Sequence, residues 1–346
     1  MPKSEAIEVD AGGIDVRVTS PDRVVFAGRK ETKLDLVNYY LAVADGALLG
    51  VMERPTVLKR YPKGASEEPF FQKRVPDSAP PWIPRVNIRF PSGRDADELC
   101  PTQIAHIIWA VNLGCLDLNP WPVRRNDVDH PDELRIDLDP QPGLPFDSVR
   151  KVALACNEVL KQHNLIGYPK TSGSRGIHIN VRIDTRWDFQ QVRRAALALG
   201  RAVERELPDL ATTKWWKEER GDRVFIDYNQ NARDRTVASV YSVRANDEAR
   251  VSTPLLWEDV ADVEPNDFTL ATVPARYAKL GDLGAGIDND VCDLTSLLEL
   301  SEKDEREGLG DAPWPPNFAK QEGEPTRVQP SRARDKNPDA PKKRSR

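Results

Sequence analysis

The most informative stretch of this chain is Leu134-Arg135-Ile136-Asp137-Leu138-Asp139-Pro140. Successive side chains of a β-strand point to opposite faces, so the three aliphatic residues share one face while Asp137 and Asp139 share the other. The pattern predicts a strand with one buried face and two carboxylates near its carboxyl end. A second short segment, Val224-Phe225-Ile226-Asp227-Tyr228, offers a third carboxylate from a neighbouring strand.

Clustered carboxylates repel one another unless a hard cation lies between them, and oxygen ligands suit Mg²⁺ or Mn²⁺. Asp137, Asp139 and Asp227 are therefore candidate ligands of two divalent ions. Two such ions about 3.5–4 Å apart would clamp a phosphoryl-transfer centre. The simpler interpretation is a strand that ends in a turn, because Asp and Pro both favour turns.

The segment between the two aspartate strands, residues 171–183, reads TSGSRGIHINVRI. Its second half alternates apolar and polar residues, which predicts a strand with His178 on the polar face. The first half can turn backbone N–H groups toward an anion, and Ser172 and Arg175 add side-chain donors. Taken singly, such a loop is most often a turn, and a lone histidine is most often structural. A Walker loop is excluded because the Gly-Lys-Ser/Thr ending is missing.

Three ordered segments together resemble the motifs of the archaeo-eukaryotic primase superfamily. They are Asp137-Leu138-Asp139, Ser172-Gly173-Ser174-Arg175-Gly176-Ile177-His178 and Ile226-Asp227-Tyr228-Asn229-Gln230-Asn231. More narrowly, the chain resembles the polymerase domain of bacterial ATP-dependent DNA ligase D and its stand-alone relatives of the Prim-PolC type. Supporting segments run from Ser20 to about Pro274, so the resemblance covers most of the chain.

The resemblance implies a mixed α/β (α+β) primase-polymerase fold over residues 1–300. An N-terminal α/β subdomain of about residues 1–125 would face a catalytic subdomain of about residues 126–300, built on a sheet like that of RNA-recognition motifs. The template would lie in the cleft between them. From residue 301 to 346 the chain is charged and Pro-rich, with a basic end from Ser331 onward. Such a segment buries too little apolar area to fold alone, so we expect a partly disordered tail.

The implied reaction is nucleotidyl transfer from a ribo- or deoxyribonucleoside triphosphate to a primer 3′-hydroxyl, with two Mn²⁺ or Mg²⁺ ions per site. Catalytic and metal-binding roles fall on Asp137, Asp139 and Asp227. The nucleotide-binding positions are Ser172, Arg175, His178, Gln230, Arg244 and Arg220. The family often prefers ribonucleotides and Mn²⁺.

DNA-binding roles are implied for two sets of residues. Phe70 and Phe71 match aromatics that stack near the templating base, and Arg23 and Lys33 match the residues that hold the 5′-phosphate of a gap. Three more cations alternate with aromatic residues, as single-stranded template binding requires: Lys59, Arg60 and Lys73. From the residues alone, the favoured interpretation of these segments is a solvated loop with some buried rings, and the family resemblance reverses that preference.

Two positions depart from the family pattern. Arg175 stands where ligase D members usually carry Lys, and a guanidinium differs from an ammonium in reach and geometry. Asn119 stands where they usually carry His, and an amide cannot become cationic. Both departures affect how the triphosphate would be held.

Composition limits the remaining possibilities. The chain has 346 residues, a net charge of −5 and 39% hydrophobic residues, enough for one large or two small domains. The negative charge argues against nonspecific coating of nucleic acid but permits a local basic groove. The four cysteines are scattered without a zinc-binding spacing, which indicates reduced thiols. With no signal-peptide pattern and no apolar run of the ~18–20 residues of a membrane span, we expect a cytoplasmic protein of the bacterial nucleoid, away from membranes.

No Lys-x-Asp-Gly adenylation motif occurs, so we expect no ligase activity. The resemblance implies gapped or primed DNA with a 5′-phosphate as substrate, and as partners an ATP-dependent DNA ligase of the ligase D or ligase C type and the Ku protein. The leading hypothesis is a DNA-directed primase-polymerase that fills short gaps in end joining or excision repair. The alternatives are a non-catalytic DNA gap- or end-binding module, which would need no aspartate triad, and a two-metal nuclease, which would need no triphosphate loop.

Four local patterns predict helices. Thr32 can cap a helix that continues through Leu41, and residues 101–113 carry apolar side chains at helical spacing. Asp147 and Asp188 can each cap a further helix, and Pro208 would stop the second of these.

Overall fold

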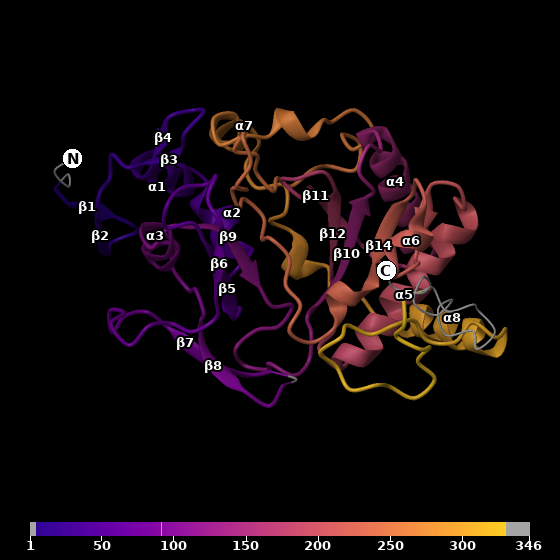
Figure 1. The fold of residues 1–346 in the computed structure, drawn as a ribbon. Helices are drawn as coiled ribbons and strands as arrows, with labels where there is room; N and C mark the ends of the chain where they lie inside the picture. Colours follow the sequence, from indigo (N-terminus) through magenta and orange to yellow (C-terminus); the bar gives the residue numbers. More distant parts are fainter. Residues whose placement is uncertain (1–4, 91, 330–346) are drawn as a thin grey trace, which may run out of the picture.

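The computed structural model describes residues 5–90 and 92–329 of the chain. It has two halves that lie side by side, one built from the first 120 residues and the other from most of the remainder (Figure 1). The elements of the first half are β1 (Ile7–Asp10), β2 (Asp15–Val18), β3 (Val24–Phe26), β4 (Glu31–Thr32), α1 (Lys33–Ala42), α2 (Ala44–Leu49), β5 (Thr56–Arg60), β6 (Phe70–Gln72), β7 (Arg85–Arg89), β8 (Asp95–Leu99), α3 (Ile104–Asn112) and β9 (Cys115–Pro120).

The elements of the second half are β10 (Glu133–Pro140), α4 (Phe146–Gln162), β11 (Tyr168–Thr171), β12 (Ile177–Arg182), α5 (Phe189–Glu206), β13 (Ala211–Thr212), α6 (Lys217–Arg220), β14 (Val224–Asp227), η1 (Tyr228–Asn231), η2 (Pro265–Asp267), α7 (Val273–Leu280), η3 (Ile287–Asn289) and α8 (Thr295–Arg306). α7 returns to the first half, where the Tyr277 hydroxyl accepts a hydrogen bond from the N–H of Gly46 in α2 at 3.1 Å. The two halves are therefore tied together by chain that follows the second sheet.

The second sheet has the strand order β11-β12-β10-β14-β13, antiparallel except for the β13–β14 pair. Leu134, Ile136 and Leu138 of β10 are at most 2% exposed and share one core with α4 and α5. Burying such a side chain is worth roughly 1.5–3 kcal/mol. The apolar face of β10 therefore fixes which face of the sheet carries the aspartates.

The first sheet has the strand order β6-β5-β8-β7, with β9 also pairing with β5. Its β5–β6 pair is antiparallel and places Lys59 opposite Phe71 and Arg60 opposite Phe70. The edge strand β6 therefore presents the predicted aromatic pair next to the predicted cations.

Two of the predicted helix caps are present. Thr32 caps α1 and Asp188 caps α5. Each cap side chain accepts a hydrogen bond from the backbone N–H of the third helical residue, and the side chain of that residue accepts one from the backbone N–H of the cap. The cap predicted at Asp147 is wrong, because α4 begins at Phe146 after Pro145. Asp147 lies inside the first turn and pairs instead with Arg150 and Lys151.

The boundary predicted at residue 300 falls inside α8. Beyond α8, the chain packs against α5: Trp314 is 4% exposed, and its ring lies 4.1 Å from the Arg193 guanidinium. The first part of the predicted tail is thus folded onto the second half. The basic cluster from Ser331 to Arg346 lies outside the described residues. Over the described ranges, no helix is both long enough and apolar enough to cross a bilayer.

Candidate active site

Four side chains form a row across the second sheet. Strand register places Lys170 opposite His178, His178 opposite Asp137, and Asp137 opposite Asp227. Residues directly opposite each other in antiparallel pairs project from the same face of the sheet. The row therefore brings the central carboxylate of β10 next to a second carboxylate on one side and to a histidine on the other.

Asp139 lies one pleat farther along β10, opposite Phe225. The guanidinium of Arg220 covers the Phe225 ring at 3.6 Å and favours ionisation of both Asp139 and Asp227. In the part of the chain that the structure describes, no three His, Cys, Asp or Glu side chains already form a metal cage. Mg²⁺ is usually held by one or two carboxylates plus substrate phosphates, so an open arrangement of this kind suits a substrate-linked ion.

The carboxylates influence one another's ionisation. Burial and the charge of Asp137 raise the pKa of Asp227 to about 7, and the same two causes raise the pKa of Asp139. Burial also opposes ionisation of Asp137, but the neighbouring His178, Lys170 and Arg244 outweigh it and lower the pKa of Asp137. The site thus holds one firmly ionised carboxylate and two that a cation would help to ionise.

His178 links the carboxylates to Lys170, a buried amine whose pKa is lowered well below its ordinary value by burial and by the charge of Arg244. Its Nε2 lies 3.3 Å from Asp137 Oδ1, and its Nδ1 lies 2.7 Å from Lys170 Nζ. Burial and the nearby Lys170 lower the pKa of His178 to about 4. The imidazole is therefore neutral at neutral pH.

A pocket of about 340 Å³ opens at the middle of this row, where Asp137 and His178 line it. Its volume is within the size range of small-ligand sites. It brings together six predicted site residues: Asp137, His178, Gln230, Arg244, Lys59 and Phe71. Asn119 also lines it and donates to the Asp117 carbonyl at 3.1 Å. The pocket thus joins predicted nucleotide-binding and DNA-binding residues from both halves.

Asp117, which no sequence motif singled out, forms ion pairs with two cations that line the pocket, Arg244 and Lys59. It is 1% exposed, and its carboxylate oxygens lie 3.4 Å from Arg244 Nε and 3.5 Å from Lys59 Nζ. Burial raises the pKa of Asp117, and both cations oppose that rise. A buried acid on β9 that faces two cations gives no signal in the sequence, because the partners come from separate strands.

Asp227 is held by the turn that follows it. It accepts hydrogen bonds from the Asn229 N–H at 2.9 Å and from Gln230 Nε2 at 3.1 Å. The side chain of Asn229 in turn accepts from Arg193 Nε at 2.7 Å and donates to the Pro313 carbonyl at 2.9 Å. The C-terminal segment therefore buttresses the strand end that carries Asp227.

The hydroxyl of Ser172 holds the conformation of the loop at residues 172–176. Ser172 Oγ accepts from the N–H groups of Ser174 at 3.1 Å and Gly176 at 3.0 Å. Gly173 has φ +67°, and a Cβ there would lie 2.9 Å from the N atom of Ser252, so glycine is required. Arg175 is exposed and lines a neighbouring hollow with Phe146 and Arg250. Ser172 and Arg175 do not line the pocket at Asp137. Three other predicted site residues also lie outside that lining: Asp139, Asp227 and Arg220.

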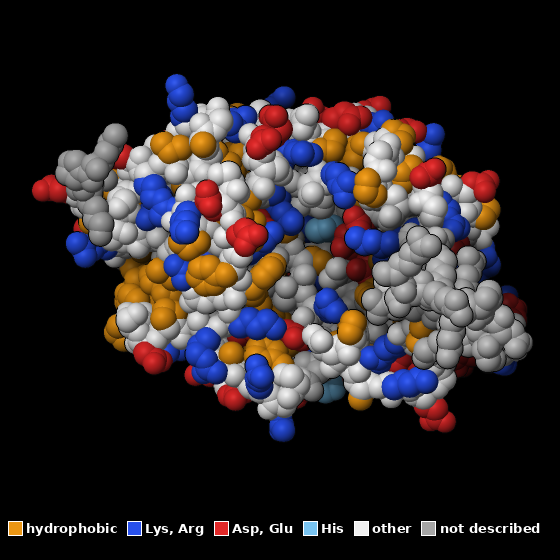
Figure 2. Space-filling model, viewed as in Figure 1, with side chains coloured by type: hydrophobic (Ala, Val, Ile, Leu, Met, Phe, Trp, Pro, Cys, Tyr) orange, Lys and Arg blue, Asp and Glu red, His pale blue; other side chains and the backbone are white. Residues whose placement is uncertain are grey.

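The remaining DNA-binding predictions fall at two places. At the pocket rim, Phe70 and Phe71 are 45% and 61% exposed, with Arg60 over Phe70 at 4.9 Å and Lys59 over Phe71 at 5.7 Å. Lys73 pairs with Asp234 and lies 4.1 Å from the Phe90 ring. Figure 2 shows basic side chains on both sides of the hollow between the halves, and acidic ones on its catalytic side.

Arg23 and Lys33 lie together on the first half, near the start of α1. Lys33 is 6% exposed and donates to the carbonyls of Thr19 at 2.6 Å and Asn112 at 3.1 Å. Burial and the adjacent Arg23 lower the pKa of Lys33 to about 8. Arg23 and Lys33 therefore form one cationic cluster, and neither of them lines the pocket at Asp137.

The family model of the LigD primase-polymerase domain matches residues 32–284. The multifunctional non-homologous end joining protein LigD of Mycolicibacterium smegmatis is 31% identical over 277 residues, which are 80% of this chain and 36% of that protein. The bifunctional non-homologous end joining protein LigD of Bacillus subtilis is 29% identical over 268 residues, which are 77% of this chain and 43% of that protein. The chain therefore spans less than half the length of these curated relatives.

A solved structure agrees with these matches. The polymerase domain of Mycobacterium tuberculosis Ligase D in complex with DNA has a TM-score of 0.75 and 28% identity to this chain, and the match covers 80% of this chain and 99% of that one. The predicted mixed α/β primase-polymerase fold and the resemblance to the ligase D polymerase domain are both confirmed. The chain belongs to the LigD primase-polymerase domain family and is a nucleotidyltransferase of that family.

Proposed function

We propose that this protein extends a primer 3′-hydroxyl on DNA from nucleoside triphosphates and fills short gaps during bacterial double-strand break repair. The observation that carries the proposal is the direct pairing of Asp227 with Asp137, because Asp137 lines a pocket together with cations and an exposed aromatic residue. Its relatives are named for non-homologous end joining. Gapped or primed DNA with a 5′-phosphate is the substrate that this role requires.

Asp137, Asp139 and Asp227 would hold the divalent ions, Mn²⁺ or Mg²⁺. The donor set fits: all three are oxygen ligands on one face of the sheet, and the charge of Asp137 raises the pKa of both others. When bound, such ions neutralise phosphate charge and favour the ionised form of the attacking hydroxyl. Arg220, on the same face, would limit the charge that accumulates there between catalytic events.

The other pocket residues would orient the two substrates. Arg244 and Gln230 would contact the triphosphate, and His178 would donate to it as a neutral group because its pKa is about 4. Lys59 and Phe71, on the opposite half, would hold the template by charge and stacking. Ser172 and Arg175 would join only if the loop closes toward the pocket, because Arg175 lines the neighbouring hollow.

Ribonucleotide preference, an ATP-dependent DNA ligase as the partner that seals the product, and Ku as the partner that holds the ends belong to the same proposal. They are what the family resemblance implies, and the LigD relatives are named for non-homologous end joining. Parallel incorporation assays with ribo- and deoxyribonucleotides test the first. Pull-down with purified ligase and Ku tests the others.

The central experiment is primer extension on gapped DNA with Mn²⁺, comparing wild type, Asp137→Ala and the surface variant Asp222→Ala. Removal of a metal ligand is expected to reduce incorporation by orders of magnitude while gap binding in a gel-shift assay stays close to wild type. Asp222 is exposed, so its variant controls for handling and folding. Near-normal incorporation by Asp137→Ala would overturn the assignment, and gap binding by an inactive wild type would favour a binding module without catalysis.

A further inference from the structure

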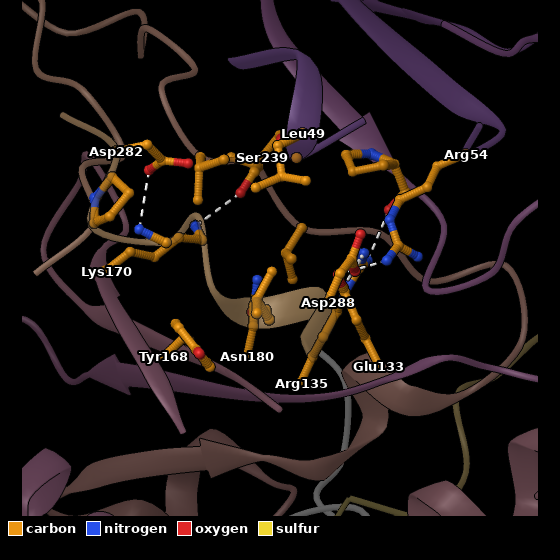
Figure 3. Close-up of a pocket in the computed structure, with 18 of the residues that line it drawn as sticks. Leu49, Arg54, Glu133, Arg135, Tyr168, Lys170, Asn180, Ser239, Asp282 and Asp288 are labelled. Atoms are coloured by element: carbon orange, nitrogen blue, oxygen red, sulfur yellow. Dashed lines mark hydrogen bonds and ion pairs between the residues drawn. The ribbon is translucent and has the colours of Figure 1, made fainter. Parts of the chain in front are cut away.

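Two buried arginines contact segments next to the aspartate strands. Arg54 donates to Glu133, at the start of β10, at 2.8 Å. Figure 3 shows these two residues beside a cavity of about 40 Å³, which admits a few water molecules but no nucleotide. Arg193, on α5, is 0% exposed and contacts the turn that follows β14 and Asp227. Arg54 therefore joins the two halves, whereas Arg193 acts beside a predicted metal ligand.

The guanidinium of Arg193 has acceptors on two separate segments. Its Nε donates to the side-chain oxygen of Asn229, in the turn η1, at 2.7 Å. Its other nitrogens donate to the Asp311 carboxylate at 2.8 Å and to two backbone carbonyls of the same segment at 2.7 and 3.2 Å. We call this segment, residues 311–327, the C-terminal strap. A buried guanidinium is tolerated only when its N–H groups are paired, so Arg193 fixes the turn and the strap relative to α5.

Asn229 connects this contact to the carboxylate. Its backbone N–H donates to Asp227 Oδ1 at 2.9 Å, and its side-chain N–H donates to the Pro313 carbonyl at 2.9 Å. A guanidinium only donates and a carbonyl only accepts, so the Asn229 amide fits in one orientation. The donors are amides and a guanidinium, which keep their protons at every pH near neutrality. A shift of the turn would therefore move the N–H that holds one oxygen of Asp227.

The C-terminal strap is held by contacts of its own. Trp314 Nε1 donates to Asp311 Oδ2 at 2.8 Å, so one carboxylate serves both Trp314 and Arg193. The buried Glu324 accepts from the Trp314 N–H at 2.8 Å and from Arg327 at 2.7 Å. The strap lies beyond residue 284, where the match to the family model ends. It therefore presents a fixed set of acceptors to Arg193 from outside the matched region.

We propose that Arg193 is a positioning residue of the metal site, which uses Asn229 and the C-terminal strap to hold Asp227 in place for a divalent cation. This role rests on the proposed function, because the cation at Asp227 belongs to that function. Asp227 Oδ1 is held by the backbone of the turn, whereas Oδ2 is held by the side chain of Gln230, which can rotate away. Oδ2 is therefore the oxygen that can be released for a cation without disturbing the turn.

The first measurement is Mn²⁺ binding to the full chain without nucleotide or DNA, followed by the electron paramagnetic resonance signal of the free ion. Arg193→Met keeps the aliphatic stem and removes the donors. Loss of one well-placed hydrogen bond typically changes binding by about tenfold, so this variant should bind Mn²⁺ about tenfold more weakly. In an Asp227→Asn background the same substitution should add no further loss, because Arg193 acts through Asp227.

Two other variants complete this measurement. Asn229→Ala removes the link while Arg193 keeps its partners on the strap, and it should weaken Mn²⁺ binding to a similar extent. Arg201→Met is the matched control on the same helix. Arg201 donates to the Gly310 carbonyl at 2.6 Å, next to the strap, but has no bond to Asn229. Its variant should bind Mn²⁺ as wild type does.

Hydrogen exchange reads the turn directly, without metal or substrate. Followed by NMR, the Asn229 amide should exchange about tenfold faster in Arg193→Met than in wild type. The amides of β12 should exchange at the wild-type rate, because a local loss of support leaves the rest of the sheet intact. Faster exchange throughout the sheet would indicate a general structural defect and would contradict a positioning role.

Excess Mn²⁺ supplies the third readout. In primer extension on gapped DNA, Arg193→Met should need about tenfold more Mn²⁺ for half-maximal incorporation and should approach the wild-type rate when Mn²⁺ is saturating. A variant with a general defect would stay impaired at every Mn²⁺ concentration, and that result would also count against the proposal.

Wild-type exchange at the Asn229 amide of Arg193→Met, or wild-type Mn²⁺ affinity in both Arg193→Met and Asn229→Ala, would overturn the proposal. If Arg193→Met does not fold, Asn229→Ala decides. A wild type that binds no Mn²⁺ would overturn the proposal together with the metal site. A wild type that binds Mn²⁺ but never incorporates nucleotide would refute the proposed function alone, since Mn²⁺ binding and exchange still decide the role of Arg193.

Discussion

Replacing Asp227 with asparagine should stabilise the metal-free protein while it destroys the metal site. Asp227 lies directly opposite Asp137, whose negative charge, together with burial, raises the pKa of Asp227 to about 7. Asparagine has nearly the same shape and keeps an oxygen that can accept from the Asn229 N–H, the contact measured at 2.9 Å. The substitution therefore removes a charge with little change in packing.

The size of the effect follows from linkage. A rise from the ordinary value of about 3.9 to about 7 is about 3 pH units, or about 4 kcal/mol as an upper limit. Because the side chain is partly exposed and loses a bond from Gln230 Nε2 on substitution, we expect about 1–2 kcal/mol. A carboxyl with a raised folded pKa binds its proton more tightly when folded, so it lowers the free energy of unfolding as pH rises from about 4 to about 7.

The assay is urea unfolding in the presence of a chelator, at about pH 8 and about pH 4. At pH 8, Asp227→Asn should be more stable than wild type by about 1–2 kcal/mol, and the difference should shrink toward zero at the lower pH. Excess Mn²⁺ should stabilise wild type and leave the variant nearly unchanged. Asp222→Asn, at an exposed position before β14, is the matched control.

A variant that is less stable than wild type in chelator at pH 8, with no dependence on pH, would refute this reasoning. Such a result would mean that the hydrogen bonds of the Asp227 carboxylate stabilise the folded protein more than its repulsion from Asp137 destabilises it. The pocket would then be a structural polar cluster rather than a site prepared for a cation.

Four further outcomes are expected. Mn²⁺ affinity by calorimetry should rise with pH up to about 7 and level off above it, because the ion displaces a proton from Asp227; a flat profile contradicts this. Asp117→Asn should raise KM for the nucleotide about tenfold by freeing Arg244, and an unchanged KM argues against that support. Phe71→Ala should weaken template binding, measured by fluorescence anisotropy, by about tenfold. The free energy of unfolding should change by no more than about 0.5 kcal/mol, because the ring is 61% exposed. A template affinity equal to that of wild type would contradict stacking. Trp314→Ala should lower the free energy of unfolding by about 3 kcal/mol, since the ring is buried on Arg193, whereas an unaffected transition would mean that this segment is only loosely attached.

Local patterns in the sequence were sufficient for much of the fold. The alternation in residues 134–139 predicted the buried apolar face of β10, although Arg135 on the opposite face is buried as well. The caps at Thr32 and Asp188 predicted two helix starts. These features depend on residues within one turn or one pleat of each other, so neighbouring letters carry them. The failure at Asp147 has the same local origin, because the helix begins directly after Pro145, two residues earlier than a cap at Asp147 would allow.

That Asp137 and Asp139 share a strand face follows from the spacing of neighbouring residues, and the motifs that identify the family are likewise continuous segments of the chain. The position of β10 between β12 and β14 is visible only in the folded sheet, and it aligns His178, Asp137 and Asp227 in one row. The same strand order gave Lys170 its partner. The physical reason is that the register between strands depends on the packing of the whole sheet, and no short segment of the chain encodes it.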